Sequence, residues 1–313
     1  MKFFRKILLG VIIIYVIALM IDIFISRSYL KSSLFDDELK VWNTILNKEL
    51  KEKDILIFGS SRAMVHINPK ILYEITGESS FNLGFNGQRL PLIKYRLEES
   101  LNYSKPRNVI LVLDNFSFQS KYIFKEDQLA PLLLFNKKLY DIQKNNGYYN
   151  IYDVYIPLIR YSKNKEKHSW LIELYKVYAY SKQRVYREEG YRKNDFKWTE
   201  NQLDYKYSQI EFEEHTFLLL QEIINKCKHE NINLILVTSP TYKDLLKYQV
   251  NNEFVINKIR VLSQKNNIIY KDYSKESRLM DKKYFANSSH LNSKGADIFT
   301  KKLAEDIKPY LKR

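Results

Sequence analysis

The chain has 313 residues, of which 45% are hydrophobic, enough to bury the core of one large domain or two small ones. Lys and Arg outnumber Asp and Glu by 51 to 36, giving a net charge of +15. That charge fits nucleic acid, an anionic membrane surface or an acidic polymer as partner, and equally a lysine-rich proteome. A single cysteine, Cys227, excludes an internal disulfide. Scattered histidines and the lack of a P-loop lead us to expect no metal, no nucleotide and no other cofactor.

Residues 1–27 have the composition of a membrane anchor. A basic start, MKFFRK, precedes an apolar stretch over residues 7–25 that only Asp22 interrupts. About 20 residues cross the hydrocarbon core of a bilayer, and the positive flank predicts a cytoplasmic N-terminus. Because no small-residue cleavage signal follows, an uncleaved anchor is favoured over a signal peptide. We therefore expect a single-pass protein of the cell membrane with an extracytoplasmic remainder, which excludes nucleic acid as a partner.

Beyond the anchor, residues 28–52 predict a juxtamembrane helix, and an alternation of strands and helices follows. The strand-like runs are DILIFG, SFNLG, NVILVLD, NLILVTS and NIIYKD. The first helix between them has Asn68 as its expected cap, Pro69 at its first position and Gly77 at its end. The order predicts a three-layer α/β/α sandwich with a five-stranded parallel sheet, of the flavodoxin-like type, over residues 53–117 and 208–313. Ligands of such sheets lie at the carboxyl ends of the strands.

Residues 118–207 interrupt this pattern and hold 14 of the 25 tyrosines. The stretch SWLIELYKVYAYSKQRVYR has a helical apolar stripe, so we expect a mostly helical insertion with its own small core. An alternative interpretation is a lid or acceptor-binding surface, on which tyrosines stack against sugar rings and lysines meet anionic groups.

Three short stretches carry the residues that could do chemistry. The first strand ends in GSSR, which places Ser61 at the active edge of the sheet. NLGFNG follows the second strand, and its glycines allow backbone N–H groups to face an oxyanion. NSSHLNSKGA precedes the last helix and holds His290 on a polar loop. Each stretch alone also fits an ordinary helix cap or turn. Four of the chain's eight glycines fall in these three stretches, which favours a shared functional role.

Together, GSSR, NLGFNG and SSHLNSKGA resemble the SGNH (GDSL-type) hydrolase superfamily, over about residues 53–117 and 211–312. The resemblance is to its membrane-anchored branch, which includes the D-alanyl transfer protein of teichoic-acid biosynthesis and alginate O-acetylation proteins. It implies that Ser61 is the nucleophile, His290 the base, and the N–H groups of Ser61 and Gly84 oxyanion donors. Asn115 is the nearest equivalent of the family's third donor, although the glycine before it is missing, and Asn86 competes for that role.

The sequence departs from the family at position 287, where Asn287 stands in place of the acidic member of the triad. An amide can orient an imidazole, but it cannot stabilise an imidazolium by charge. Three options follow: a working site without the acid, an acid supplied from elsewhere, for which Asp272 and Asp281 are candidates, or a catalytically weak protein.

The resulting expectation is a membrane-anchored extracytoplasmic serine acyltransferase or esterase. Its substrates would be O-acetyl or D-alanyl esters of a cell-surface polysaccharide or teichoic-acid-like polymer, with a membrane-bound partner to deliver the acyl donor. The alternatives are a weak or inactive assembly or polymer-binding protein, and a polysaccharide deacetylase.

Overall fold

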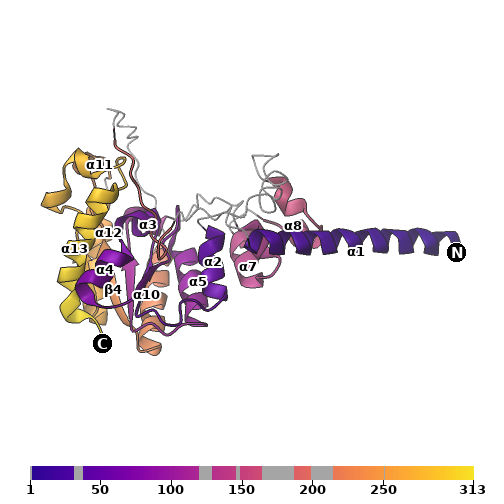
Figure 1. The fold of residues 1–313 in the computed structure, drawn as a ribbon, viewed down its shortest axis with the longest axis horizontal. Coiled ribbons are helices and arrows are strands. Elements are labelled where there is room, and N and C mark those ends of the chain that lie inside the picture. Colours follow the sequence, from indigo (N-terminus) through magenta and orange to yellow (C-terminus); the bar gives the residue numbers. More distant parts are fainter. Residues whose placement is uncertain are drawn as a thin grey trace. The chain divides into compact units, whose positions relative to one another are not determined.

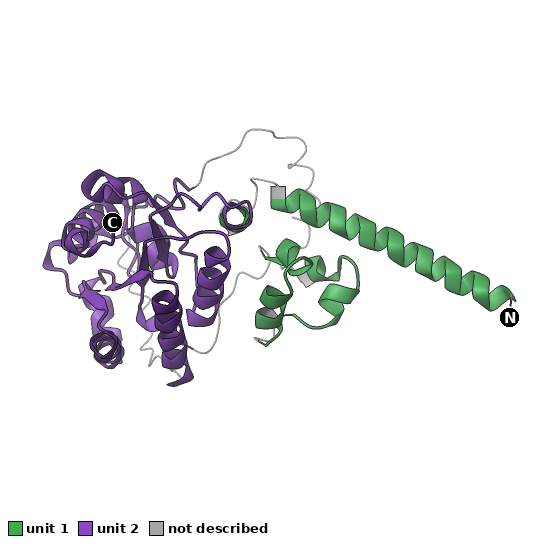
Figure 2. Ribbon diagram, turned by 90° about the horizontal axis from the view of Figure 1, so that it is seen from below, with its two compact units in different colours: residues 1–43, 124–185 green, residues 44–123, 186–313 purple. Residues whose placement is uncertain are grey.

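The structure, a computed structural model, describes residues 2–31, 38–119, 129–145, 149–163, 187–198, 214–249 and 251–313. The chain forms two compact units, each described here by itself (Figure 2). Unit 1 comprises residues 1–43 and 124–185, and unit 2 comprises residues 44–123 and 186–313. The stretch of residues 169–187 that predicted a helical stripe lies largely outside the described residues, so the helical insertion over 118–207 stays a prediction.

Unit 2 is built on a five-stranded sheet, of which Figure 1 labels β4. The strand order is β2-β1-β3-β4-β5. The strands are β1 (Ile55–Phe58), β2 (Ser80–Asn82), β3 (Asn108–Val112), β4 (Asn233–Thr238) and β5 (Ile269–Asp272). All four neighbouring pairs are parallel. The central strands are buried on both faces, which explains their uninterrupted apolar sequences. The predicted five-stranded parallel sheet and three-layer fold are confirmed.

The helices of unit 2 cover both faces of this sheet, and in Figure 1 α4 and α13 lie together while α5 and α10 lie together. They are α3 (Ser61–His66), α4 (Pro69–Thr76), α5 (Leu90–Leu101), α10 (Glu214–His229), α11 (Lys243–Tyr248), α12 (Asn252–Asn266) and α13 (Ser293–Ile307). Helix α4 begins and ends as its sequence predicts, capped by Asn68 and closed by Gly77 in the left-handed conformation. Helices α3 and α11 were not predicted, because six residues are too few to show a periodic pattern. The last helix ends at Ile307, before a 3₁₀ turn (Lys308–Tyr310).

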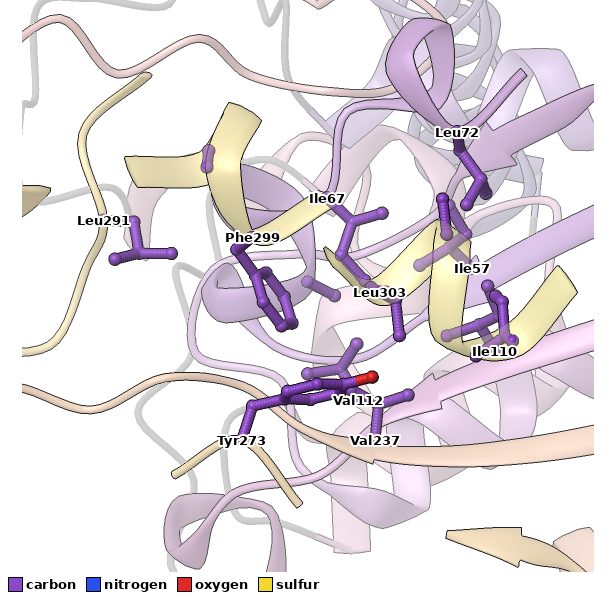
Figure 3. Packing of buried hydrophobic residues seen from close by; sticks show 14 of the residues in the cluster. Ile57, Ile67, Leu72, Ile110, Val112, Val237, Tyr273, Leu291, Phe299 and Leu303 are labelled. Atoms are coloured by element: carbon purple, nitrogen blue, oxygen red, sulfur yellow. The ribbon is translucent and has the colours of Figure 1, made fainter. Parts of the chain in front are cut away.

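The hydrophobic core lies between one face of the sheet and helices α3, α4 and α13 (Figure 3). Side chains alternate along a strand, so every second residue faces this layer; from the three central strands these are Ile55, Ile57, Ile110, Val112, Ile235 and Val237. Phe299 and Leu303 of α13 pack onto them, and Leu291 enters the same core from the loop before α13. The loop that carries His290 is therefore anchored in the core by its next residue.

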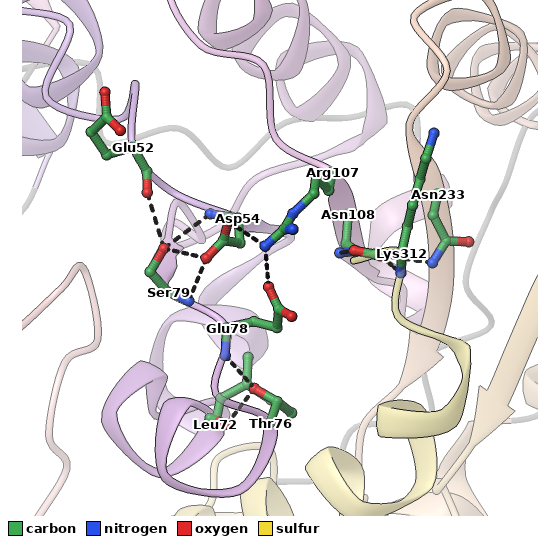
Figure 4. Close-up of polar contacts among 10 residues, drawn as sticks. All are labelled: Glu52, Asp54, Leu72, Thr76, Glu78, Ser79, Arg107, Asn108, Asn233 and Lys312. Atoms are coloured by element: carbon green, nitrogen blue, oxygen red, sulfur yellow. Dashed lines mark hydrogen bonds and ion pairs between the residues drawn. The ribbon is translucent and has the colours of Figure 1, made fainter.

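The opposite edge of the sheet, at the amino ends of the strands, is held by polar contacts (Figure 4). Arg107 pairs with Asp54 at 2.7 Å and with Glu78 at 2.5 Å. The side chain of Asn108 donates to the carbonyl of Lys312 and accepts from Asn233, which ties the C-terminus to β3 and β4. These contacts fix one edge of the sheet and leave the carboxyl ends of the strands for the candidate site.

Unit 1 contains α1 (Lys2–Lys31), α6 (Ala130–Leu133), α7 (Lys137–Asn145), α8 (Tyr152–Tyr155) and the 3₁₀ helix η3 (Ile159–Lys163). By length and composition α1 can cross a membrane over residues 2–30. Its most apolar 18 residues have a mean hydropathy of 2.9, and 6% of them are buried. The juxtamembrane helix predicted over residues 28–52 is shorter than expected. Helix α1 itself continues to Lys31, and α2 covers Glu38–Leu46.

A buried ion pair joins α1 to the second segment of unit 1. Asp22 and Arg160 are both fully buried and form a two-pronged contact, with Arg160 Nη1 2.7 Å from Asp22 Oδ2 and Nη2 bound to Oδ1. Ser26 accepts a further bond from Arg160, and the Leu158 N–H donates to Asp22. Because both oxygens of the Asp22 carboxylate accept hydrogen bonds, these contacts offset the desolvation cost of burying the two charges.

We predict that Arg160→Met destabilises the detergent-solubilised full chain by about 3–5 kcal/mol, because it leaves the Asp22 carboxylate buried without a counter-charge. Adding Asp22→Leu should recover most of that loss. Thermal unfolding measures both, with Arg278→Met, at an exposed arginine, as the matched control. If Arg160→Met unfolds at the same temperature as Arg278→Met, the predicted destabilisation by an unpaired Asp22 carboxylate is wrong.

Candidate active site

The turn after β1 is where the candidate site begins. Gly59 has φ +150°, and a Cβ at this position would lie 2.8 Å from the Ala63 Cβ and from the Val112 carbonyl oxygen. Only glycine therefore lets α3 start immediately against β3. Ser60 caps α3, accepting the Arg62 N–H at 3.2 Å and donating to Asp114 Oδ2 at 2.7 Å. This sharp turn leaves Ser61 as the first residue of α3, at the carboxyl end of β1.

Ser61 and His290, 229 residues apart in the sequence, meet through a hydrogen bond. The Ser61 Oγ lies 2.7 Å from His290 Nε2. On the other side of the ring, His290 Nδ1 lies 3.0 Å from Asn287 Oδ1. The structure thus brings together the three side chains that the sequence proposed as catalytic, in the order hydroxyl, imidazole, amide.

The backbone around Asn287 determines which nitrogen of His290 carries the proton. Asn287 Oδ1 also accepts the N–H groups of Ser289 and His290, each at 2.9 Å. Two backbone donors can face only the oxygen of the amide, so its orientation is fixed. Nδ1 must then be the protonated nitrogen of the neutral ring, and Nε2 is left as the acceptor for the Ser61 hydroxyl. An amide at position 287 therefore selects the tautomer that a carboxylate would select.

The pKa of His290 is lowered to about 4, although the ring keeps some exposure to solvent. Desolvation is the largest cause, the positive charges of Arg62 and Arg192 add to it, and the Asp114 carboxylate opposes it. At neutral pH the ring is therefore uncharged and Nε2 is free of a proton.

Neither alternative acid reaches this ring. Asp272 accepts the N–H of Ser274 and lies 3.8 Å from Arg260. Asp281 caps a 3₁₀ turn at Lys283 and pairs with the same lysine. Of the options left by the sequence, a site without a carboxylate on His290 is the one that the described residues display.

A second histidine, which sequence reasoning missed, supports the loop of the first. His66 is fully buried, and its Nε2 accepts the Leu291 N–H at 3.0 Å, next in the chain to His290. Its Nδ1 lies 3.1 Å from the Ser239 hydroxyl, to which it donates. Burial, and then the charges of Arg62 and His290, hold the pKa of His66 well below its ordinary value. The only signal in the sequence was its place five residues after Ser61.

Residues 187–198, which we call the strap, join the three stretches of the site. The Arg187 guanidinium donates to the Gly84 carbonyl, and the Arg192 N–H donates to the Met64 carbonyl at the end of α3. Further along, the Asn194 carbonyl accepts the Ser293 N–H at 2.7 Å, three residues after His290. The sequence assigned the strap to the insertion, and no motif in it indicated these contacts.

The expectation for Gly84 needs correction. Its N–H donates to Asn82 Oδ1 at 2.9 Å, so it is not free to bind an oxyanion. A Cβ here would lie 2.5 Å from the Met64 nitrogen, which shows that this glycine serves close packing against α3. The amide of Asn82 in turn holds the carbonyls of Ala63 and Ile67.

Other donors remain for an oxyanion. The N–H of Ser61, in the first turn of α3, makes no hydrogen bond within the described chain. Gly87 has a left-handed φ of +73°, and its N–H is also without a partner there. Asn86 is exposed, whereas the buried side chain of Asn115 donates to Gln249 Oε1 at 3.4 Å.

A pocket of about 580 Å³ borders the His290 loop. It lies between the end of the strap and the residues around α13's start, and its lining includes Lys197, Lys282, Lys283, Lys294, Phe196 and Trp198. Lys283 pairs with Asp281, whereas Lys197 and Lys294 have no acidic partner among the described residues. The described ranges hold no cluster of three metal-ligating side chains. The lining also includes Asp195 but neither Ser61 nor His290. The pocket therefore offers a surplus of positive charge and aromatic surface next to the loop that carries His290.

No family model matches the chain, and no curated protein matches it. Among solved structures, it is similar to the lipase/acylhydrolase from Enterococcus faecalis, with 13% identity, 83% of this chain and 97% of that one covered, and a TM-score of 0.45. It is also similar to a GDSL-like lipase from Bacteroides thetaiotaomicron, with 12% identity, 85% of this chain and 97% of that one covered, and a TM-score of 0.43. A third similar structure is the psychrotrophic esterase EstA from Pseudoalteromonas, with 11% identity, 82% of this chain and 97% of that one covered, and a TM-score of 0.44. Likeness at this level does not decide function, which has to come from the geometry of Ser61, Asn287 and His290.

We expect the ring of His290 to titrate near pH 4 rather than near 6.5, since desolvation and two arginines disfavour its charged form. Histidine ring NMR of the full chain over pH 3.5–8, with His290→Ala to assign the signal, measures the midpoint. A midpoint at 6.5 or above would contradict the electrostatics described here.

Proposed function

We propose that the chain is a serine-dependent acyl-ester enzyme, an esterase or acyltransferase, with Ser61 as nucleophile and His290 as general base. One observation carries the proposal: the Ser61 hydroxyl lies 2.7 Å from an imidazole nitrogen whose tautomer is fixed from the other side. A hydroxyl and a base within hydrogen-bond reach, with the base oriented by a third group, are what nucleophilic catalysis requires.

The reaction follows from this geometry. Ser61 Oγ attacks the acyl carbonyl while its proton passes to His290 Nε2, giving a tetrahedral oxyanion that the free N–H of Ser61 can receive. The C–O bond of the ester then breaks, and Nε2 returns the proton to the leaving oxygen. The acyl group remains on Ser61 until a second hydroxyl, from water or an acceptor, attacks it by the same steps in reverse.

Asn287 determines how efficiently this site can catalyse the reaction. It selects the productive tautomer, which avoids the roughly 10⁴-fold loss that follows when an amide selects the wrong one. It brings no charge to stabilise the imidazolium, and the low pKa of His290 makes that ring a weaker base. The combination supports an active but slow enzyme rather than an inert protein.

We further propose that the substrate is an ester, O-acetyl or D-alanyl, of a cell-surface polymer that carries anionic groups. Helix α1 supports membrane anchoring, because it is long and apolar enough to span. The pocket beside the His290 loop supports an anionic polymer, because lysines without acidic partners line it together with Phe196, which is 77% exposed. Anchoring through α1 with unit 2 on the outer side of the membrane places the candidate site within reach of such a polymer.

Labelling with a serine-directed fluorophosphonate tests the catalytic assignment. Full-length protein should label at Ser61, and Ser61→Ala should abolish the label. His290→Ala should slow labelling by about 10²–10⁴-fold, since it removes the base. Ser289→Ala is the matched control, because Ser289 lies beside the histidine but contributes only its backbone N–H to Asn287. Equal labelling of Ser61→Ala and the unmodified chain would refute the assignment.

The pocket can be tested separately. Replacing Lys197 and Lys294 by alanine should raise the KM for an anionic polymer ester by about fivefold, the value of two exposed charge contacts. Turnover of a small neutral aryl acetate should stay unchanged, and added salt should shrink the difference. Lys265→Ala, an exposed lysine on α12, is the control. An equal effect on both substrates would exclude a role for the pocket in polymer binding.

A further inference from the structure

Residues 149–162, which we call the α8 segment, have an unusual surface for a chain in which 28% of residues are charged. The segment contains two charged side chains, Asp153 and Arg160, and both are 1% exposed. Between its polar ends, where Asn150 and Ser162 are exposed, the exposed side chains are large and apolar or aromatic: Ile151, Tyr152, Tyr155 and Ile156, between 45% and 63% exposed. Such a surface is poorly matched to water.

Hydrogen bonds hold the α8 segment in a fixed register along α1. The Tyr15 hydroxyl donates to the Tyr155 carbonyl at 2.8 Å. Seven residues further along α1, Asp22 binds Leu158 and Arg160, and four residues beyond it the Ser26 hydroxyl lies 2.7 Å from that of Tyr161. Spacings of seven and four residues lie on one face of a helix. The segment therefore runs alongside α1, with Tyr155 at its deep end and Tyr161 toward its outer end.

The depth of this contact follows from the length of α1. Lys2, Arg5 and Lys6 place the start of the apolar stretch at Ile7. At 1.5 Å per residue, Tyr15 lies about 12 Å beyond Ile7, close to half of the roughly 30 Å hydrocarbon core. Asp22 lies about 10 Å further out, still inside the opposite boundary. A segment bonded to both residues lies at the depth of the outer leaflet.

The backbone of the segment is also suited to a medium without water. Of the eleven N–H groups between residues 150 and 161, nine donate hydrogen bonds inside unit 1. Pro157 has no N–H to satisfy, and Leu158 takes an unfavourable φ of +66° while its N–H reaches Asp22. Non-helical backbone at membrane depth is tolerated only where its polar groups find partners within the protein.

We propose that the α8 segment is embedded in the outer leaflet beside α1, with Ile151, Tyr152, Tyr155 and Ile156 in contact with lipid acyl chains. The proposal rests on α1 being a membrane anchor, as put forward under the proposed function, and is independent of the chemistry at Ser61. The Asp22–Arg160 ion pair then holds the α8 segment against α1 within the hydrocarbon layer, and the segment shields both charges from the lipid. Helix α7, with exposed Lys137, Lys138 and Lys144, remains in water.

The test uses site-directed fluorescence on the full chain in phosphatidylcholine–phosphatidylglycerol vesicles. Cys227 is 1% exposed, and burial raises the pKa of its thiol to about 12, so it reacts slowly with thiol reagents. Cys227→Ala removes it altogether, and each introduced cysteine is then the one thiol in the chain. Environment-sensitive probes are attached through Tyr152→Cys, Tyr155→Cys, Ile14→Cys and Lys144→Cys, one at a time. Ile14, 70% exposed on α1, reports the anchor, and Lys144 reports the aqueous surface.

We expect a quencher on the lipid acyl chain to reduce emission at positions 152 and 155 to an extent comparable with position 14, and iodide to quench only position 144. Quenching of both segment positions by iodide, with position 14 quenched by lipid, would overturn the embedded segment while keeping the anchor. Protection from both quenchers would overturn it in favour of a protein contact, such as a second copy. Quenching of the probe at position 14 by iodide would show that α1 is not in the membrane and would refute the anchor. Fluorophosphonate labelling of Ser61 would be unaffected by that result.

Discussion

Three N–H groups converge on one oxygen in this protein, the Oδ1 atom of Asn287. Two of them are backbone donors from Ser289 and His290, and the third is Nδ1–H of the His290 ring. The backbone donors fix the orientation of the amide, and the amide fixes the tautomer of the ring. Without that constraint, the proton could reside on Nε2, and the Ser61 hydroxyl would face a donor instead of a base.

The fold supplies this constraint through contacts that are distant in the sequence. Leu291 anchors the loop in the hydrophobic core, and its N–H is held by the buried ring of His66. The strap binds the end of α3 on one side and Ser293 on the other, so the serine and histidine stretches share a common support. Polar contacts at the amino ends of the strands keep that edge rigid, while Gly59 lets the chain turn directly into the site.

Much of unit 2 could be predicted from the sequence, because continuous apolar runs and the Asn68, Pro69 and Gly77 signals are local. Ser61 and His290 could be found for a similar reason, since each stands in a short motif at a turn. His66, the strap and the occupied N–H of Gly84 could not be found, because their importance depends on contacts between separate segments. Asp22 shows the same limit: in the sequence it interrupts a membrane span, and only the structure reveals Arg160 as its partner.

No carboxylate among the described residues hydrogen-bonds the ring of His290, which gives the site a distinct electrostatic character. Desolvation and the charges of Arg62 and Arg192 favour the neutral form of the ring and lower its pKa, and the opposing charge of Asp114 does not outweigh them. A neutral base with a fixed tautomer is ready at physiological pH, but it gains little when it becomes charged during the reaction. The tautomer of His290 is therefore the property on which activity most directly depends.

Nitrogen-15 NMR of histidine-labelled full chain at pH 7 measures that property directly, with His290→Ala to assign the ring. We expect His290 to show a protonated Nδ1 and an unprotonated Nε2, and the difference should disappear in Asn287→Ala. A ring with its proton on Nε2 in the unmodified chain would contradict the proposed role of Asn287, and with it the assignment of His290 as the base for Ser61.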